Sequence, residues 1–216
     1  MTRTIVAKIG HDVEHLFQSI NPMNCSGDRS QIPRLIPDQP FPPYSFVPGH
    51  HPHPMSDPLG HSYGQVMEPV EPPDPMCWSQ CRPYLRGIDL FNHGYYWEAH
   101  EEWESLWHSF GRQGEAADFV KGLIQLAVAG VKVRQGFSEV VKTHAHRAED
   151  IFNRLSSSKA VSNRQFMGLS LAELANRAHE IVDNVNVIHA HPELPVAIVF
   201  SFVLRPHPYP VPKPFD

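Results

Sequence analysis

The stretch LFNHGYYWEAHEEWESLW, residues 90–107, decides the fold. Asn92 and Gly94 are residues that end helices, because both tolerate the left-handed conformation found just after a last turn. After them, large apolar side chains recur at three- and four-residue intervals, which is the period of an amphipathic helix. The stretch therefore predicts two successive helices. The first begins near Pro83 and stops at NHG, and the second covers residues 96–110 and ends before Gly111.

Proline marks the limits of the helical part of the chain. Of the 22 prolines, 14 precede Cys77 and seven lie from Pro192 onward, whereas 84–191 contains none. Proline removes an amide donor and clashes with the preceding helical turn, so this interval predicts a helical domain. We divide the chain into a Pro/His-rich extension at 1–76, a helical domain at 77–191 and a Pro-rich tail at 192–216.

The extension is expected to be disordered or draped over the helical domain, since its composition buries little apolar surface. Its HHPHP tract, His50, His51 and His53, could catch a metal ion adventitiously, but its prolines prevent a regular ligand spacing, so a physiological metal role is disfavoured. A start codon further downstream, at Met55 or Met67, is an open alternative, so translation of the first 55–66 residues is left open.

The helical domain contains three further helices by the same periodicity. They are expected at 115–135, at 138–155 and from Ser170 to about 187, where the sequence SLAE forms a capping box. The 115–135 helix is apolar almost all round, so it should be the centre of an all-α, compact multihelical bundle of about five helices. Its polar residues are Lys121, Gln125 and Lys132, and Gly122, Ala129 and Gly130 give it a low surface for close packing. The apolar segment at 194–204 fits either a short strand or a strap across the bundle.

Composition excludes several classes of function. The chain has a net charge of -5, and residues 77–191 hold 12 Lys+Arg against 13 Asp+Glu, which gives no basic footprint for nucleic acid. No apolar run reaches the roughly 20 residues of a membrane helix. The three cysteines, Cys25, Cys77 and Cys81, fit neither a disulfide scaffold nor a zinc pair, so we expect a cytoplasmic protein.

The helix at 96–110 divides into a core face, a solvent face and a polar seam between them. Helical projection places the core face at Ala99, Trp103, Leu106, Trp107 and Phe110. The solvent face is expected to hold Glu98, Glu102, Ser105 and Ser109, with the Glu98 carboxylate in the first turn, where it favours the helix dipole. The seam consists of His100, Glu101, Glu104 and His108.

Three roles are open for a carboxylate beside an imidazole in this seam. It can orient a catalytic base, share a metal ion, or satisfy a half-buried ring nitrogen and do no more. HEEWE is not the HExxH of zinc peptidases, because residue 104 is Glu. No Glu-x-x-His pair of di-iron bundles occurs in this helix either.

Further polar groups would have to come from other helices. Gln125 is polar on an apolar helix, and His144 lies on the buried stripe of the helix at 138–155. A hydrogen-bonded core histidine is the simpler interpretation of His144. The sharper hypothesis is one pocket formed by Glu98, His100, Glu101, Glu104, Trp107, Gln125 and His144. Its candidate metal ligands are His100, Glu101 and His144, and the ligand is otherwise open between a divalent metal and a small cationic or amide molecule.

The same residues carry a resemblance. YLRGIDLFNHGYYWEAHEEWESLW, then FVKGLIQLAVAGVKVRQG and GLSLAEL, resemble the domain of unknown function 309 family over about 84–185. The resemblance implies a compact helical bundle with no established activity, and it carries over Asn92, Gly94, Tyr96, Glu98, His100, Glu101, Trp107, Gly122 and Gln125. Phe137 and the long N-terminal extension depart from the family's pattern.

Two hypotheses of function follow. The leading one is a binding or interaction module with a polar pocket on the EAHE helix. The alternative is a metal-dependent, hydrolase-like enzyme in which His100, Glu101 and His144 bind a divalent ion and Glu104 or Glu98 acts as base. The absence of a nucleophile motif, phosphate loop or dinucleotide fingerprint favours the first. Neither substrate nor partner follows from the sequence, and a homo-oligomer is an open alternative.

Overall fold

The computed structural model describes residues 32–66, 70–158 and 165–207. Within these ranges the chain is an all-α bundle, as predicted. Its α-helices are α1 (Arg82–Asn92), α2 (Tyr96–Ser109), α3 (Gly114–Arg134), α4 (Ser138–Ser156) and α5 (Leu171–Asn184). They are accompanied by the 3-10 helices η2 (Pro75–Gln80) and η4 (Val185–Val187) and by a small antiparallel hairpin of β1 (Gln165–Phe166) and β2 (Leu169–Ser170).

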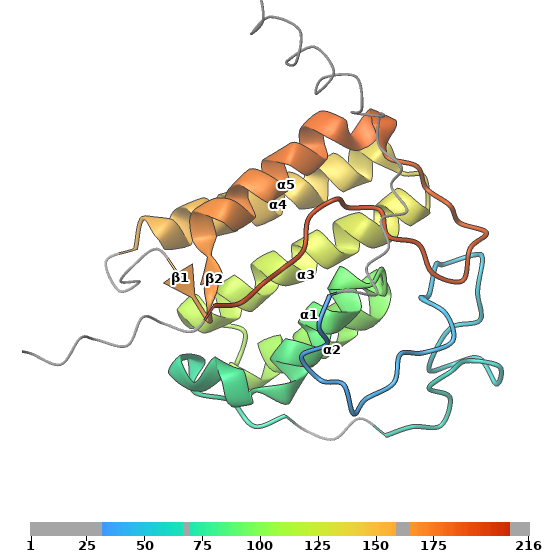
Figure 1. The fold of residues 1–216 in the computed structure, drawn as a ribbon, viewed down its shortest axis with the longest axis horizontal. Helices are drawn as coiled ribbons and strands as arrows, with labels where there is room; N and C mark the ends of the chain where they lie inside the picture. The colour runs from blue at the N-terminus through green and yellow to red at the C-terminus, as the bar shows by residue number, and fades with distance from the viewer. Residues whose placement is uncertain (1–31, 67–69, 159–164, 208–216) are drawn as a thin grey trace, which may run out of the picture.

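Helix α3 lies at the centre of the bundle (Figure 1). Helices α2 and α4 pack on it, α1 packs on α2, and α5 packs on α4. The close approach depends on two glycines of the low surface predicted from the sequence. A Cβ at Gly122 would lie 2.5 Å from the Phe152 ring of α4, and one at Gly130 would lie 2.5 Å from the Tyr96 ring of α2. Both distances are below van der Waals contact, so these positions require glycine for a packing reason.

The helix limits agree with the sequence except at the end of α5. Ser170 caps α5 by accepting a hydrogen bond from the Glu173 amide, as the capping box predicts. The helix was expected to continue to about 187, but its last turn, Val185–Val187, tightens into η4. Tightening of a last turn into 3-10 geometry is common where carbonyl groups lose their partners.

Residues 196–207, which we call the C-terminal strap, cross the bundle without forming helix or strand, with a bend at Ser201 (Figure 1). Phe200, Phe202 and Leu204 are buried, and Phe91 of α1 lies 5.9 Å from both phenylalanine rings. The strap has no strand partner among the described residues, so of the two alternatives left by the sequence the structure takes the strap. Gly94, with φ +87°, makes room for its start, because a Cβ there would lie 2.7 Å from the Ala197 carbonyl oxygen.

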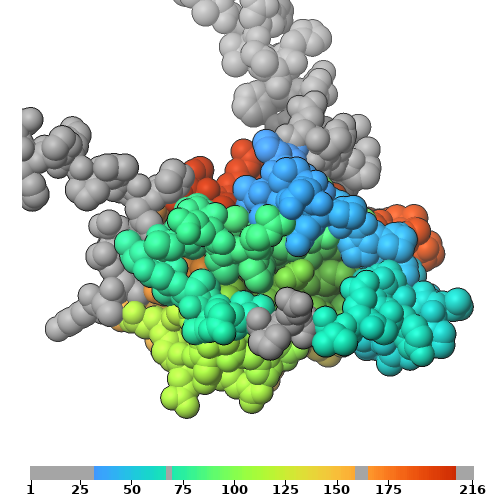
Figure 2. Space-filling model, turned by 90° about the horizontal axis from the view of Figure 1, so that it is seen from below, coloured from blue at the N-terminus to red at the C-terminus, as the bar shows by residue number. Residues whose placement is uncertain are grey.

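Residues 32–66, the N-terminal arm, lie against α1 and α2 without forming helix or strand (Figure 2). Ile36, Phe46 and Val47 are buried, and the Ser45 amide donates to the Pro195 carbonyl group just before the strap. Residues 1–31 and 67–69 of the predicted extension and the tail after the strap, 208–216, lie outside the described residues. Among the described helices, none combines the length and apolar character needed to cross a membrane.

Candidate functional site

The polar seam of α2 brings three potential ligand groups together. His100 Nδ1 lies 3.3 Å from Glu101 Oε1, and His100 Nε2 lies 3.7 Å from Glu104 Oε2. One ligand atom from each residue falls within 4.8 Å of the others. All three side chains are half-buried, and the Trp97 ring centroid lies 5.4 Å from that of His100. A histidine with two carboxylates could hold a divalent cation whose remaining ligands are water.

Two further members of the predicted pocket, Gln125 and His144, pair with each other. His144 Nδ1 lies 2.8 Å from Gln125 Oε1, which joins α4 to α3. An amide oxygen only accepts, so Nδ1 donates and the ring lone pair is at Nε2. Among the described residues the group of potential metal ligands contains His100, Glu101 and Glu104 without His144. The sequence singled out both polar groups but not the pairing of Gln125 with His144, and their convergence in one pocket stays a prediction.

Glu98 does not lie on a solvent face, and that expectation was wrong. Glu98 is only 7% exposed, because the N-terminal arm covers it. Its Oε1 accepts a hydrogen bond from the Phe46 amide at 2.9 Å and lies 3.2 Å from His61 Nε2. The other oxygen, Oε2, is buried and has no hydrogen-bond partner among the described residues. Glu98 is therefore an anchor for the arm rather than a neighbour of His100 in the seam.

The rest of the predicted solvent face is also partly covered. Glu102 is half-buried, and burial raises the pKa of its carboxyl group, while the positive charge of Arg86 opposes this rise. Trp107, assigned to the core face, is half-buried with Lys121 Nζ 5.8 Å and Arg112 Cζ 5.3 Å from its ring centroid. Trp107 thus contributes a cation–π surface at the end of α2.

Two charged residues of α1 escaped the sequence analysis. Asp89 is 1% exposed and accepts hydrogen bonds from the Leu35 and Ile36 amides, both at 2.8 Å. Its Oδ2 also accepts from Arg34 Nε at 3.1 Å. One turn earlier, Arg86 donates to the Gln39 carbonyl oxygen at 2.8 Å and to that of Pro40 at 2.5 Å. The available signal was two charges three residues apart, within the largely apolar stretch YLRGIDLF.

A second set of buried polar side chains holds the C-terminal strap and the segment before it. Asn92 donates to the Leu204 carbonyl oxygen at 2.8 Å and accepts from the Leu204 amide at 2.7 Å. The Tyr96 hydroxyl accepts from the Val199 amide at 3.0 Å. Arg134 donates to the carbonyl oxygen of His191 at 3.1 Å. The sequence indicated Asn92 as a helix stop and Tyr96 as a helix start, and both residues carry the resemblance. Neither pattern predicted that they bind the strap.

Protonation of His144 should destabilise the protein. Burial, with the charges of Arg147 and Lys132, lowers the pKa of His144. His144 therefore binds a proton more tightly in the unfolded chain than in the folded protein. The stability that neutral His144 contributes is present above about pH 6.5 and is lost as pH falls through the lower pKa of the folded protein. We expect His144→Gln to flatten the fall in unfolding free energy between about pH 7.5 and 5.5, measured by urea denaturation.

Some pH dependence should persist in that variant. Burial also lowers the pKa of His51, so His51 contributes in the same direction. Glu102, with its raised pKa, acts in the opposite direction, because stability rises as pH falls through its folded pKa. An unchanged slope in His144→Gln would contradict the role given to His144.

These features define a class of protein: a small all-α bundle whose polar side chains on α1 and α2 clasp extended segments from both sides of the helical domain. Residues 84–142, from α1 into the start of α4, match the family model described as domain of unknown function (DUF309). The resemblance is confirmed over these residues, which include Asn92, Tyr96, Glu98 and the His100 group, whereas the expected range extended to about 185. No curated protein matches the chain.

Proposed function

We propose that the protein is a non-catalytic binding module and that the α1–α2 face is a site for an extended polypeptide. The observation that supports this best is the contact between α1–α2 and the N-terminal arm. Asp89 accepts hydrogen bonds from two consecutive amides of the arm, and Glu98 accepts from a further amide. Arg86 donates to two consecutive carbonyl groups of the arm. Hydrogen bonds to main-chain groups provide affinity for an extended segment whatever its side chains are.

Aromatic contacts would supply the specificity of such a site. Phe41 stacks on Tyr95 with ring centroids 4.8 Å apart, and Arg34 Cζ lies 3.7 Å from the Phe41 centroid. Phe46 packs edge-on against Trp97 at 4.7 Å. A competing segment should therefore be extended and carry aromatic side chains at the positions of Phe41 and Phe46. In this proposal the arm is an internal occupant that such a segment replaces.

Exchange of the arm tests the proposal. A protease site in place of residues 67–69 allows the folded full chain to be cut between the arm and the helices. A fluorescent peptide of residues 33–48 is then titrated by anisotropy. We expect the cut protein to bind it at least about 100-fold more tightly than the uncut protein, because a tethered occupant has an effective concentration in the millimolar range.

Two outcomes would reject this function. The first is that the cut arm dissociates while the bundle keeps its helical circular dichroism, yet the peptide does not bind. The second is that the peptide binds cut and uncut protein equally. A matched peptide with Phe41 and Phe46 replaced by serine controls for nonspecific binding.

A metal-dependent hydrolase is the second candidate, favoured by the 4.8 Å grouping of His100, Glu101 and Glu104. A bound divalent ion would polarise a substrate carbonyl group or activate water. In this candidate Glu101 and Glu104 would hold the ion together with His100.

Calorimetric titration with Zn²⁺ and Mn²⁺ tests the metal site. The candidate predicts one saturable site that disappears in His100→Ala and Glu104→Gln. It should persist in His146→Ala, because His146 is an exposed histidine on α4. Equal binding by all four proteins would reject the site.

A further inference from the structure

One edge of the C-terminal strap has no hydrogen-bond partners among the residues that the structure describes. The Val199 amide and both main-chain groups of Leu204 bond to side chains of α2 and α1, and the His207 amide donates to the Gly168 carbonyl group. Between these anchors, the main-chain groups of Ser201, Val203 and Arg205 make no hydrogen bond within the described part of the chain. Successive residues of an extended chain direct these groups to opposite sides. With Leu204 facing α1, its neighbours Val203 and Arg205 face away from α1.

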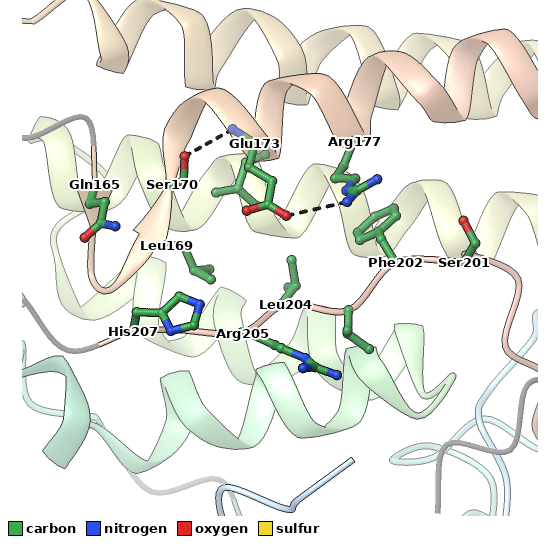
Figure 3. Close-up of a pocket in the computed structure, with 12 residues that line it drawn as sticks. Gln165, Leu169, Ser170, Glu173, Arg177, Ser201, Phe202, Leu204, Arg205 and His207 are labelled. Carbon is green, nitrogen blue, oxygen red and sulfur yellow. Dashed lines mark hydrogen bonds and ion pairs between the residues drawn. The ribbon is translucent and has the colours of Figure 1, made fainter. Parts of the chain in front are cut away.

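Two hollows adjoin this part of the strap along α5. The larger, about 400 Å³, lies between the first turns of α5 and strap residues 201–207 (Figure 3). The smaller, about 120 Å³, lies nearer the end of α5, and Ile181, Ile188 and Phe200 contribute to its wall. Arg177 and Phe202 meet between the two hollows, with Cζ 5.8 Å from the ring centroid. A cavity of 400 Å³ falls in the range of sites that enclose a ligand.

The charge of the larger hollow favours an acidic group. Glu173 lies 3.6 Å and Glu180 2.9 Å from Arg177, so these neighbouring carboxylates already compensate that guanidinium. Arg205 is exposed and has no ion pair within the described ranges, and it lines the cavity from the strap side, as His207 does (Figure 3). Among the described residues of the lining, Arg205 is thus the charged side chain without an ion-pair partner. An incoming carboxylate would be stabilised beside Arg205.

We infer that the open edge of the strap is a docking site for an extended peptide that adds alongside it as a strand, with an acidic side chain beside Arg205 and an apolar side chain in the smaller hollow. Strand addition satisfies the unpaired amide and carbonyl groups, and pockets for side chains give specificity. This site is separate from the α1–α2 face, so the inference does not depend on the exchange of the N-terminal arm.

Peptide binding to the uncut full chain tests this inference. The probes are fluorescein-labelled Val-Thr-Val-Thr-Val-Thr-Glu, its reversed sequence, and the same pair with Lys in place of Glu. We expect one Glu probe to bind saturably, with Kd below about 1 mM, and at least about tenfold more tightly than its Lys counterpart. Amide exchange should slow at Ser201, Val203 or Arg205 when it binds.

Three variants separate strand addition from nonspecific attraction. Val203→Pro removes an amide that is unpaired in the free protein, so helical circular dichroism should persist while probe binding is lost. Arg205→Glu should reverse the preference in favour of the Lys probe. Arg147→Glu, an equal change of charge at an exposed position on α4, should leave the preference unchanged.

Four outcomes would overturn the inference. They are no saturable binding of any probe below about 1 mM, normal binding to a folded Val203→Pro variant, the same preference in Arg205→Glu as in the parent, and displacement by free glutamate at the concentration of the peptide. The last would indicate a small-molecule carboxylate site instead of a strand-addition site.

Discussion

Replacing Asp89 with alanine is expected to detach the start of the N-terminal arm from α1 and to lower the free energy of arm docking by about 3 kcal/mol. The substitution leaves the Leu35 and Ile36 amides and the Arg34 guanidinium without their shared acceptor. Asp89 is only 1% exposed, so water reaches the unpaired arm groups only if the arm moves away from α1. The helices pack through other residues, so the arm should open before the bundle unfolds.

Limited proteolysis and amide exchange measure this opening. We expect cleavage within residues 34–46 and exchange of the Leu35 and Ile36 amides to accelerate about 100-fold, with helical circular dichroism unchanged. Asp118→Ala is the matched control, because Asp118 is 39% exposed and pairs with Arg154 at 3.0 Å. Such an exposed ion pair contributes at most about 1 kcal/mol, so arm cleavage should stay at the parent rate. An arm equally protected in both variants would show that Asp89 does not anchor it.

The helical part of the fold was predictable because its signals are local. The helix stop at Asn92–Gly94, the capping box at Ser170 and the apolar surround of α3 each depend on residues within a few turns of one another. The low surface at Gly122 and Gly130 was also readable, since glycine is costly in a helix interior without a packing reason. None of these inferences required knowledge of distant segments.

The error at Glu98 has the opposite cause. Projection of a single helix places Glu98 opposite the tryptophan face, and such a face is exposed unless another segment covers it. The segment that covers Glu98 is distant in sequence: Phe46, whose amide donates to Glu98, lies 52 residues earlier in the chain. The proline-rich composition of the arm concealed its few buried side chains, and hydrogen bonds to main-chain groups leave no pattern in side-chain sequence.

The candidate site was predictable only in parts. His100, Glu101 and Glu104 are neighbours on one helix, so their proximity follows from helical geometry. His144 and Gln125 belong to two helices, and their polar character on apolar stripes marked each without fixing its partner. Whether two such pairs share a pocket depends on how far each helix is rotated about its axis, which periodicity determines only coarsely.

Replacing Trp103 with alanine should cost about 3–5 kcal/mol of unfolding free energy, the largest effect expected for a single substitution in α2. Trp103 is 0% exposed, and its indole donates to the Tyr84 carbonyl oxygen at 3.3 Å. Gly87 of α1 is shaped to receive it, since a Cβ there would lie 2.2 Å from Trp103 Nε1. Alanine leaves a cavity between α1 and α2 and removes the hydrogen bond from the indole to the Tyr84 carbonyl oxygen.

Trp107, one turn further along α2, provides the matched control. It is half-buried and contacts the cations of Arg112 and Lys121, so Trp107→Ala should cost about 1–2 kcal/mol. Urea denaturation followed by circular dichroism compares the two variants without relying on indole fluorescence. Equal losses would mean that the α1–α2 contact does not depend on the insertion of Trp103 over Gly87. A larger loss of unfolding free energy in Trp103→Ala would mean that this insertion fixes how α1 lies on α2. The same contact would then set the spacing between Asp89 and Glu98, which both bind the N-terminal arm.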